Sequence, residues 1–173
     1  MAVRSYNSRR EVEQYNFHPT VTLLVPLAAI LLQSYLPRLF WGFTYLDLPV
    51  IVVVFFSVAR RNPIIGTITG ALIGLLQDAL TAQSIGINGI AKSVVGYLAA
   101  SIGVRVDVEN TLTRVLMSFG FTLLNSLLYF FVQERILGMA VHWPFVHDLL
   151  RSLVTAVVAV PLFAILDLTK RRE

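Results

Sequence analysis

The chain contains no cysteine and few charged residues, and both shortages restrict what it can be. Without cysteine among its 173 residues, it can form neither a disulfide framework nor a metal site built on thiolates. Charged residues make up 14% of the chain, whereas soluble domains usually carry about 25%. This shortage indicates that most of the chain does not face water.

Apolar residues dominate instead. Hydrophobic residues make up 56% of the sequence, and its mean hydropathy is +0.72. This composition predicts an all-α, polytopic integral membrane protein with almost no soluble domain. The formal net charge is +4, but in a membrane protein an excess of Lys and Arg first reports topology. We therefore expect no nucleic-acid binding.

Six apolar segments follow a polar N-terminal stretch. A spanning helix needs about 20 apolar residues, with a range of about 17–25. By this measure segments four to six are long enough. The first three are marginal, so each could be a short or re-entrant helix, and we expect the first to end before Pro37. No A-x-A cleavage motif follows the first segment, which predicts an uncleaved anchor. The segments cover residues 20–36, 43–59, 63–80, 85–104, 112–132 and 147–168.

The basic residues predict the orientation, because cytoplasmic loops of membrane proteins are rich in Lys and Arg. Both termini are basic, which favours an even number of crossings. We predict a six-helix transmembrane domain at 20–168 between cytoplasmic tails at 1–19 and 169–173, in the inner (cytoplasmic) membrane. In this arrangement the inside holds Arg4, Arg9, Arg10, Arg60, Arg61, Arg105, Arg114, Lys170, Arg171 and Arg172, and the outside holds Arg38, Arg135 and Arg151.

Small residues form a stripe on the third segment and another on the fourth. Gly66, Gly70 and Gly74 repeat a G-x-x-x-G pattern, which places them on one helical face and allows another backbone to approach closely. The favoured interpretation is internal helix packing of the two stripes against each other. The alternative is a partner-binding face for a helix of another protein. The stripe on the fourth segment consists of Gly89, Ser93, Gly96, Ala100 and Gly103.

Several polar side chains fall inside the apolar segments, where charges are costly and often functional. Lys92 can extend toward the interface or reach Asp78 across the turn between the third and fourth segments. We favour an ion pair that holds this hairpin together. An ion or substrate pathway and contact with a partner remain alternatives. The intramembrane polar residues are Asp47, Gln77, Asp78, Asn88, Lys92 and Asn125.

Catalytic and metal-binding patterns are not recognisable in the sequence. His142 and His147 are five residues apart, whereas a spacing of four puts two ligands on one helical face. His18 is the remaining histidine. Asp107 and Glu109 are most simply solvated loop residues. We therefore predict no catalytic residue, no cofactor and no metal site.

One stretch of the chain supports a resemblance. Residues 70–98 read GALIGLLQDALTAQSIGINGIAKSVVGYL, which closely resembles the signature region of the bacterial rod shape-determining protein MreD family. The D-L-P sequence at 47–49 and the basic turn at 60–61 also resemble this family. The matching residues are Gly74, Leu75, Asp78, Leu80, Gly86, Ala91, Lys92, Val95, Gly96 and Tyr97.

The resemblance implies a non-catalytic scaffold or regulator of cell-wall elongation, which acts with the bitopic protein MreC. It also implies a wider complex with the actin-like MreB, the glycosyltransferase RodA and a penicillin-binding transpeptidase. The family's fold is similar to the S components of energy-coupling factor transporters, so a vitamin-binding transporter subunit is the alternative. S components commonly dock through an A-x-x-x-A patch on the first helix. Here Ala28 and Ala29 are followed by Leu32 and Gln33, so that patch is missing.

Overall fold

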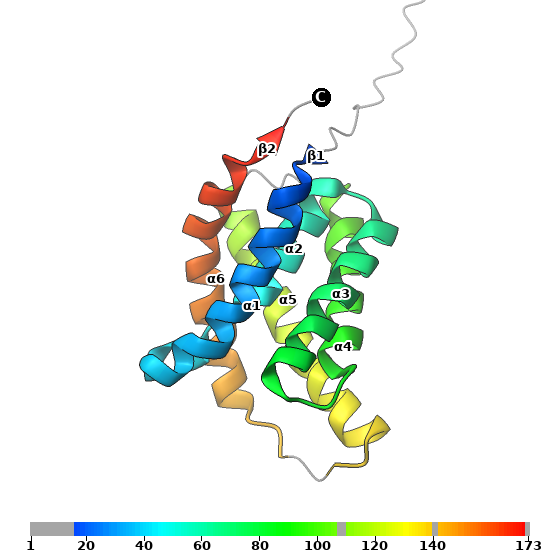
Figure 1. The fold of residues 1–173 in the computed structure, drawn as a ribbon, viewed down its shortest axis with the longest axis vertical. Coiled ribbons are helices and arrows are strands. Elements are labelled where there is room, and N and C mark those ends of the chain that lie inside the picture. The colour runs from blue at the N-terminus through cyan, green and yellow to red at the C-terminus, as the bar shows by residue number, and fades with distance from the viewer. Residues whose placement is uncertain (1–15, 107–109, 140–141, 172–173) are drawn as a thin grey trace, which may run out of the picture.

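The computed structural model describes residues 16–106, 110–139 and 142–171, and this part of the chain forms a bundle of six α-helices (Figure 1). The all-α prediction is confirmed. Most of the expected N-terminal tail, together with Asp107, Glu109 and Arg172, lies outside the described residues. The helices are α1 (Pro19–Leu39), α2 (Leu48–Arg60), α3 (Pro63–Thr81), α4 (Ile87–Gly103), α5 (Thr111–Phe131) and α6 (Phe145–Asp167).

Two short strands join the ends of the described chain. β1 (Asn16–Phe17) pairs antiparallel with β2 (Lys170–Arg171). This pairing holds the first and last described residues at the same end of the bundle (Figure 1). The turn between α3 and α4 and the end of α5 lie at the opposite end.

Helix α2 lies in the centre of the bundle. Each of its residues from Leu48 to Ala59 is buried, and it contacts α1, α3, α4, α5 and α6. A helix that is apolar on every side is typical of such a central position. Its 13 residues extend about 20 Å, less than the hydrocarbon thickness of about 30 Å. α2 is therefore both shorter than the hydrocarbon layer is thick and surrounded by other helices.

The lengths of the remaining helices differ from the expectation in part. α1, α3, α5 with its π-helical extension (Val132–Ile136), and α6 are the four described helices long and apolar enough to cross a membrane. The expectation that the first and third segments are marginal was wrong, because α1 has 21 residues and α3 has 19. α4 has 17 residues, at the lower limit of the spanning range.

The boundaries of α1 and α4 explain these differences. α1 continues through Pro37 to Leu39, because a proline near the helix end removes only one backbone donor. α4 begins only at Ile87, because Gly86 adopts a left-handed φ of 107° that ends the preceding turn.

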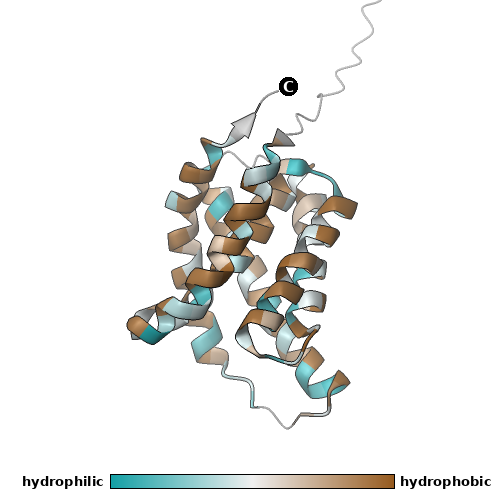
Figure 2. Cartoon of the chain, viewed as in Figure 1, coloured by the Kyte–Doolittle hydropathy of each residue, from teal (hydrophilic) through white to brown (hydrophobic). Residues whose placement is uncertain are grey.

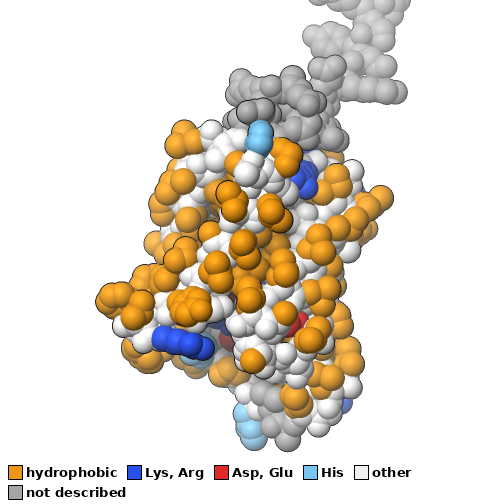
Figure 3. Space-filling view, viewed as in Figure 1, with side chains coloured by type: hydrophobic (Ala, Val, Ile, Leu, Met, Phe, Trp, Pro, Cys, Tyr) orange, Lys and Arg blue, Asp and Glu red, His pale blue; other side chains and the backbone are white. Residues whose placement is uncertain are grey.

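Large apolar side chains cover the outside of the bundle. Figure 2 shows hydrophobic residues along the length of the helices, and Figure 3 shows their side chains across the visible face. Exposed examples come from α1, α3, α5 and α6: Leu23, Leu72, Leu116 and Val157. In water such a surface would be unfavourable, whereas lipid chains solvate it. The exterior therefore fits a membrane protein.

Candidate functional site

The glycines of α3 bring its backbone into direct contact with α4. A Cβ atom at any of the three would overlap a backbone carbonyl of α4, and a Cβ at Gly96 would in turn overlap the carbonyl of Gly66. α3 has contacts with α4 along its length. Close approach through glycine is how helices gain packing contacts where no water drives their association. The facing pairs are Gly66 with Gly96, Gly70 with Lys92, and Gly74 with Asn88.

The remaining small residues of α4 have different neighbours. A Cβ at Gly89 would lie 3.1 Å from the side chain of Leu75 in α3. Ser93 turns its hydroxyl back to its own helix and donates to the Gly89 carbonyl at 2.7 Å. Gly103 faces α2, where a Cβ would lie 3.0 Å from the Val58 carbonyl oxygen. The stripe on α4 therefore lies against two helices, not one.

Asp78 closes the α3–α4 hairpin from a fully buried position. Its carboxylate accepts the backbone N–H of Gly86 at 2.8 Å and of Asn88 at 3.1 Å. It also accepts the side-chain N–H of Asn88 at 2.8 Å. The first N–H groups of a helix lack partners within the helix and carry partial positive charge. A residue at the end of α3 thus caps the first turn of α4.

Lys92 is also fully buried. Its ammonium donates to the Asn88 side-chain oxygen at 2.8 Å, and Asn88 donates to Asp78. No direct ion pair joins Lys92 to Asp78 in the described part of the chain. The expected hairpin pair is therefore a relay through Asn88. Asn88 precedes Lys92 by one helical turn, so the two side chains lie on the same face.

Asp47 joins α2 to α6. Its carboxylate caps α2 by accepting the Val50 N–H at 3.2 Å, and it forms an ion pair with Arg151 at 2.5 Å. Its own N–H donates to the Thr155 hydroxyl at 3.1 Å. Arg151, predicted to lie on the outside, is near the start of α6. The structure adds that it is the partner of a buried carboxylate.

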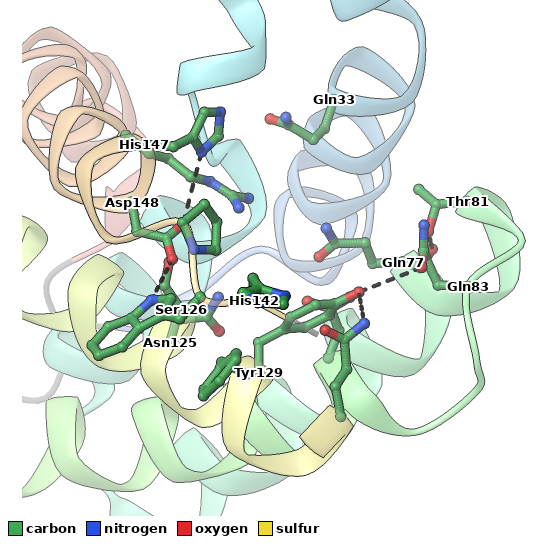
Figure 4. Close-up of a pocket in the computed structure, with 16 residues that line it drawn as sticks. Gln33, Gln77, Thr81, Gln83, Asn125, Ser126, Tyr129, His142, His147 and Asp148 are labelled. Atoms are coloured by element: carbon green, nitrogen blue, oxygen red, sulfur yellow. Dashed lines mark hydrogen bonds and ion pairs between the residues drawn. The ribbon is translucent and has the colours of Figure 1, made fainter. Parts of the chain in front are cut away.

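A polar pocket of about 430 Å³ opens at this end of the bundle, opposite the two strands (Figures 1 and 4). Its lining side chains come from α1, from the C-terminal parts of α3 and α5, from the starts of α4 and α6, and from the connections between these helices. Three of these residues, Gln77, Asn88 and Asn125, were predicted from the sequence as intramembrane polar groups. Most of the others were missed, because they are spread over several segments and connections and only the fold brings them together. They include Gln33, Gln83, Ser126, Tyr129, Gln133, Asp148 and Arg151.

Hydrogen bonds fix several of the lining side chains. The indole N–H of Trp143 donates to Asp148 at 2.8 Å, and His147 lies 3.8 Å from the same carboxylate. On the other side, Gln133 donates to the Tyr129 hydroxyl at 3.2 Å, and that hydroxyl donates to Gln83 at 3.4 Å (Figure 4). The described residues contain no group of three or more His, Cys, Asp or Glu side chains arranged to hold a metal ion.

Comparison with protein families identifies the chain. The model of the family described as rod shape-determining protein MreD matches residues 14–169 of the 173. The chain therefore belongs to the MreD family, and the predicted resemblance is confirmed. This is a family of shape-determining structural membrane proteins and not a known enzyme family. Comparison with curated proteins and with solved structures gave no match, so the expected similarity to S components is not confirmed.

Proposed function

We propose that this MreD family member is a non-catalytic scaffold or regulator of the rod (elongasome) complex, which supports peptidoglycan elongation by binding MreC. The observation that carries this proposal is the family match over residues 14–169. The proposed wider complex contains MreB, RodA and a penicillin-binding transpeptidase. The chain's part in it is to hold other membrane segments in place.

The proposed setting is the inner membrane, with six crossings and both termini in the cytoplasm. Four described helices have the length and composition of membrane spans. The pairing of β1 with β2 supports an even number of crossings, because it holds both ends of the described chain on one side. α2 and α4 cross inside the bundle in this arrangement. Other helices surround much of their surface, so their shorter lengths cause little mismatch with the lipid.

The glycine contacts support an indirect role in partner binding. Gly66, Gly70 and Gly74 face the backbone of α4, so a helix of another protein cannot occupy the same face. We propose that they contribute by fixing the shape of the bundle. MreC would then bind to the outer, lipid-facing sides of the helices, which carry the large exposed apolar side chains.

Deletion of the gene followed by complementation tests this function in the cell. The proposal predicts that cells without the protein lose their rod shape and that the wild-type chain restores it. Cells that keep a normal rod shape after deletion would contradict the proposal.

A further inference from the structure

The connection between α1 and α2 exposes three large apolar side chains in succession. It runs from the end of α1 through the short 3-10 helix η1 (Trp41–Tyr45). Leu39, Phe40 and Trp41 are 73%, 64% and 76% exposed. In Figure 1 this segment, coloured cyan, extends sideways from the bundle at the end opposite the two strands. Such a patch is unfavourable in water, so we expect a partner with an apolar surface to cover it.

The rest of the connection is held against the bundle. Phe43 packs against the buried core, and Leu46 is itself buried. The ring of Tyr45 lies 4.8 Å, centroid to centroid, from that of His147 at the start of α6. The ring of Trp41 lies perpendicular to that of Tyr45, with centroids 5.6 Å apart. The exposed side chains are therefore presented on a fixed support.

The length of α1 gives the depth of this connection in a membrane. β1 ends at Phe17, and α1 begins at Pro19. The 21 residues of α1 extend about 30 Å, which matches the hydrocarbon thickness of a bilayer, about 30 Å. With the strand end at one interface, the connection reaches the headgroup region of the opposite leaflet. Tryptophan is enriched at this level of membrane proteins.

Arg38 adds a positive charge beside these apolar side chains. It is exposed, and its guanidinium lies 5.9 Å from the centre of the Tyr35 ring. Among the described residues no acidic side chain forms an ion pair with it. Residues 38–46 contain no acidic residue, and Asp47, which follows, is buried and paired with Arg151. The connection thus offers a cation for a phosphate, and no acidic group for the amine of a zwitterionic headgroup.

We propose that Arg38, Phe40 and Trp41 form a binding surface for an anionic phospholipid in the leaflet opposite the strand end. The guanidinium binds the headgroup phosphate through paired hydrogen bonds, and the two aromatic rings lie among the upper parts of the acyl chains. Figure 3 shows basic side-chain atoms beside the hydrophobic side chains of this projecting segment. The bound lipid fixes the height of this end of the bundle in the bilayer.

This inference needs a membrane location but no particular protein partner. Failure to recover MreC would leave the lipid surface standing, and failure of lipid binding would leave the proposed scaffold standing.

Quenching of Trp41 by brominated lipids tests the proposal in nanodiscs that hold the full-length protein. Trp143→Phe removes the signal of the other tryptophan. Nanodiscs of equal composition carry bromine either on phosphatidylglycerol, which is anionic, or on phosphatidylcholine, which is zwitterionic. We expect phosphatidylglycerol to be preferred at Trp41 by about fivefold. Equal quenching by the two lipids, or no quenching by either, as when water or a protein covers the patch, would overturn the proposal.

Two exposed arginines at this end of the bundle provide matched variants. Arg135 lies in the π-helical extension of α5, which Figure 1 shows in yellow on the other side of the bundle. Arg38→Gln should abolish the preference for phosphatidylglycerol at Trp41, whereas Arg135→Gln should leave it unchanged. A preference that survives Arg38→Gln, or that both substitutions reduce equally, would contradict the assignment.

Thermal unfolding checks the result in a chain that keeps both tryptophans. Phosphatidylglycerol added to the protein in neutral detergent micelles should raise the melting temperature, because a lipid that binds the folded state stabilises it. Arg38→Gln should reduce this rise, and Arg38→Lys should retain part of it. An equal rise in the wild-type and Arg38→Gln proteins would overturn the proposal.

Discussion

The carboxylate of Asp78 accepts both N–H groups of Asn88, the backbone one at 3.1 Å and the side-chain one at 2.8 Å. The two residues come from the end of α3 and the first turn of α4, so this contact ties the two ends of the hairpin turn together. Asn88 also accepts from Lys92 at 2.8 Å. One asparagine therefore links a buried carboxylate to a buried ammonium group.

Replacing Asp78 with alanine should destabilise the hairpin. The substitution leaves the N–H groups of Gly86 and Asn88 buried without an acceptor and removes a negative charge near Lys92. We expect a loss on the order of 3 kcal/mol in the free energy of unfolding. Asp78→Asn should cost less, because an amide oxygen retains one acceptor. Unfolding of the purified protein in mixed detergent micelles measures both, and an unchanged stability of the alanine variant would refute the capping role.

Gly70 and Gly120 provide a matched test of the α3–α4 contact. A side chain at Gly70 would overlap the backbone carbonyl of Lys92, whereas Gly120 on α5 has open space where a Cβ would lie. Gly70→Leu should therefore separate the two helices and destabilise the protein by about 3 kcal/mol or more. Gly120→Leu should be tolerated. The folded yield and the melting temperature of the two variants compare them directly, and wild-type behaviour of Gly70→Leu would exclude the packing role.

The ion pair between Asp47 and Arg151 should show strong coupling. Arg151→Met leaves the buried Asp47 carboxylate without its cation, which should cost about 3–5 kcal/mol. Adding Asp47→Asn should restore part of this loss, because asparagine keeps the cap on α2 and carries no charge. A double-mutant cycle on unfolding free energies measures the coupling. Additive effects of the two substitutions would show that the pair contributes no coupling.

The central position of α2 predicts a contrast between two apolar truncations. Phe56 is fully buried, whereas Leu72 on α3 is 57% exposed on the outside of the bundle. Phe56→Ala should leave a cavity and cost about 3 kcal/mol. Leu72→Ala should have little effect, since lipid chains fill the space. Comparable losses in the two variants, measured by thermal unfolding in detergent, would contradict the core position of α2.

The sequence predicted the helices well and their surroundings less well. Apolar runs and glycine spacing identify the α-helical segments and the close approach of α3 to α4. They do not show that the second segment lies inside the bundle, because a run such as that at 50–56 is equally apolar in lipid and in a protein core. The end of α1 was also missed, since Pro37 continues the helix.

The polar residues were also predicted only in part. Asp47, Asp78 and Lys92 stand out because they lie in apolar segments. Their partners do not, because Arg151 lies near the start of a helix, and a hydropathy pattern cannot distinguish a paired arginine from a solvated one. The pocket combines side chains from five helices and their connections, so it depends on the tertiary arrangement. The relay through Asn88 could have been inferred from its spacing of four residues from Lys92.

Affinity purification of a tagged copy from its native membrane tests the central claim, with the co-purifying proteins identified by mass spectrometry. The Gly120→Leu variant serves as the control in which the bundle stays intact. The Gly70→Leu variant is the one in which the contact between α3 and α4 is disrupted. We expect MreC and wall-synthesis enzymes to co-purify with the wild-type and Gly120→Leu proteins and to be lost with Gly70→Leu. Recovery of paired ATPase subunits and a coupling protein, without MreC, would contradict the scaffold function and favour a transporter subunit.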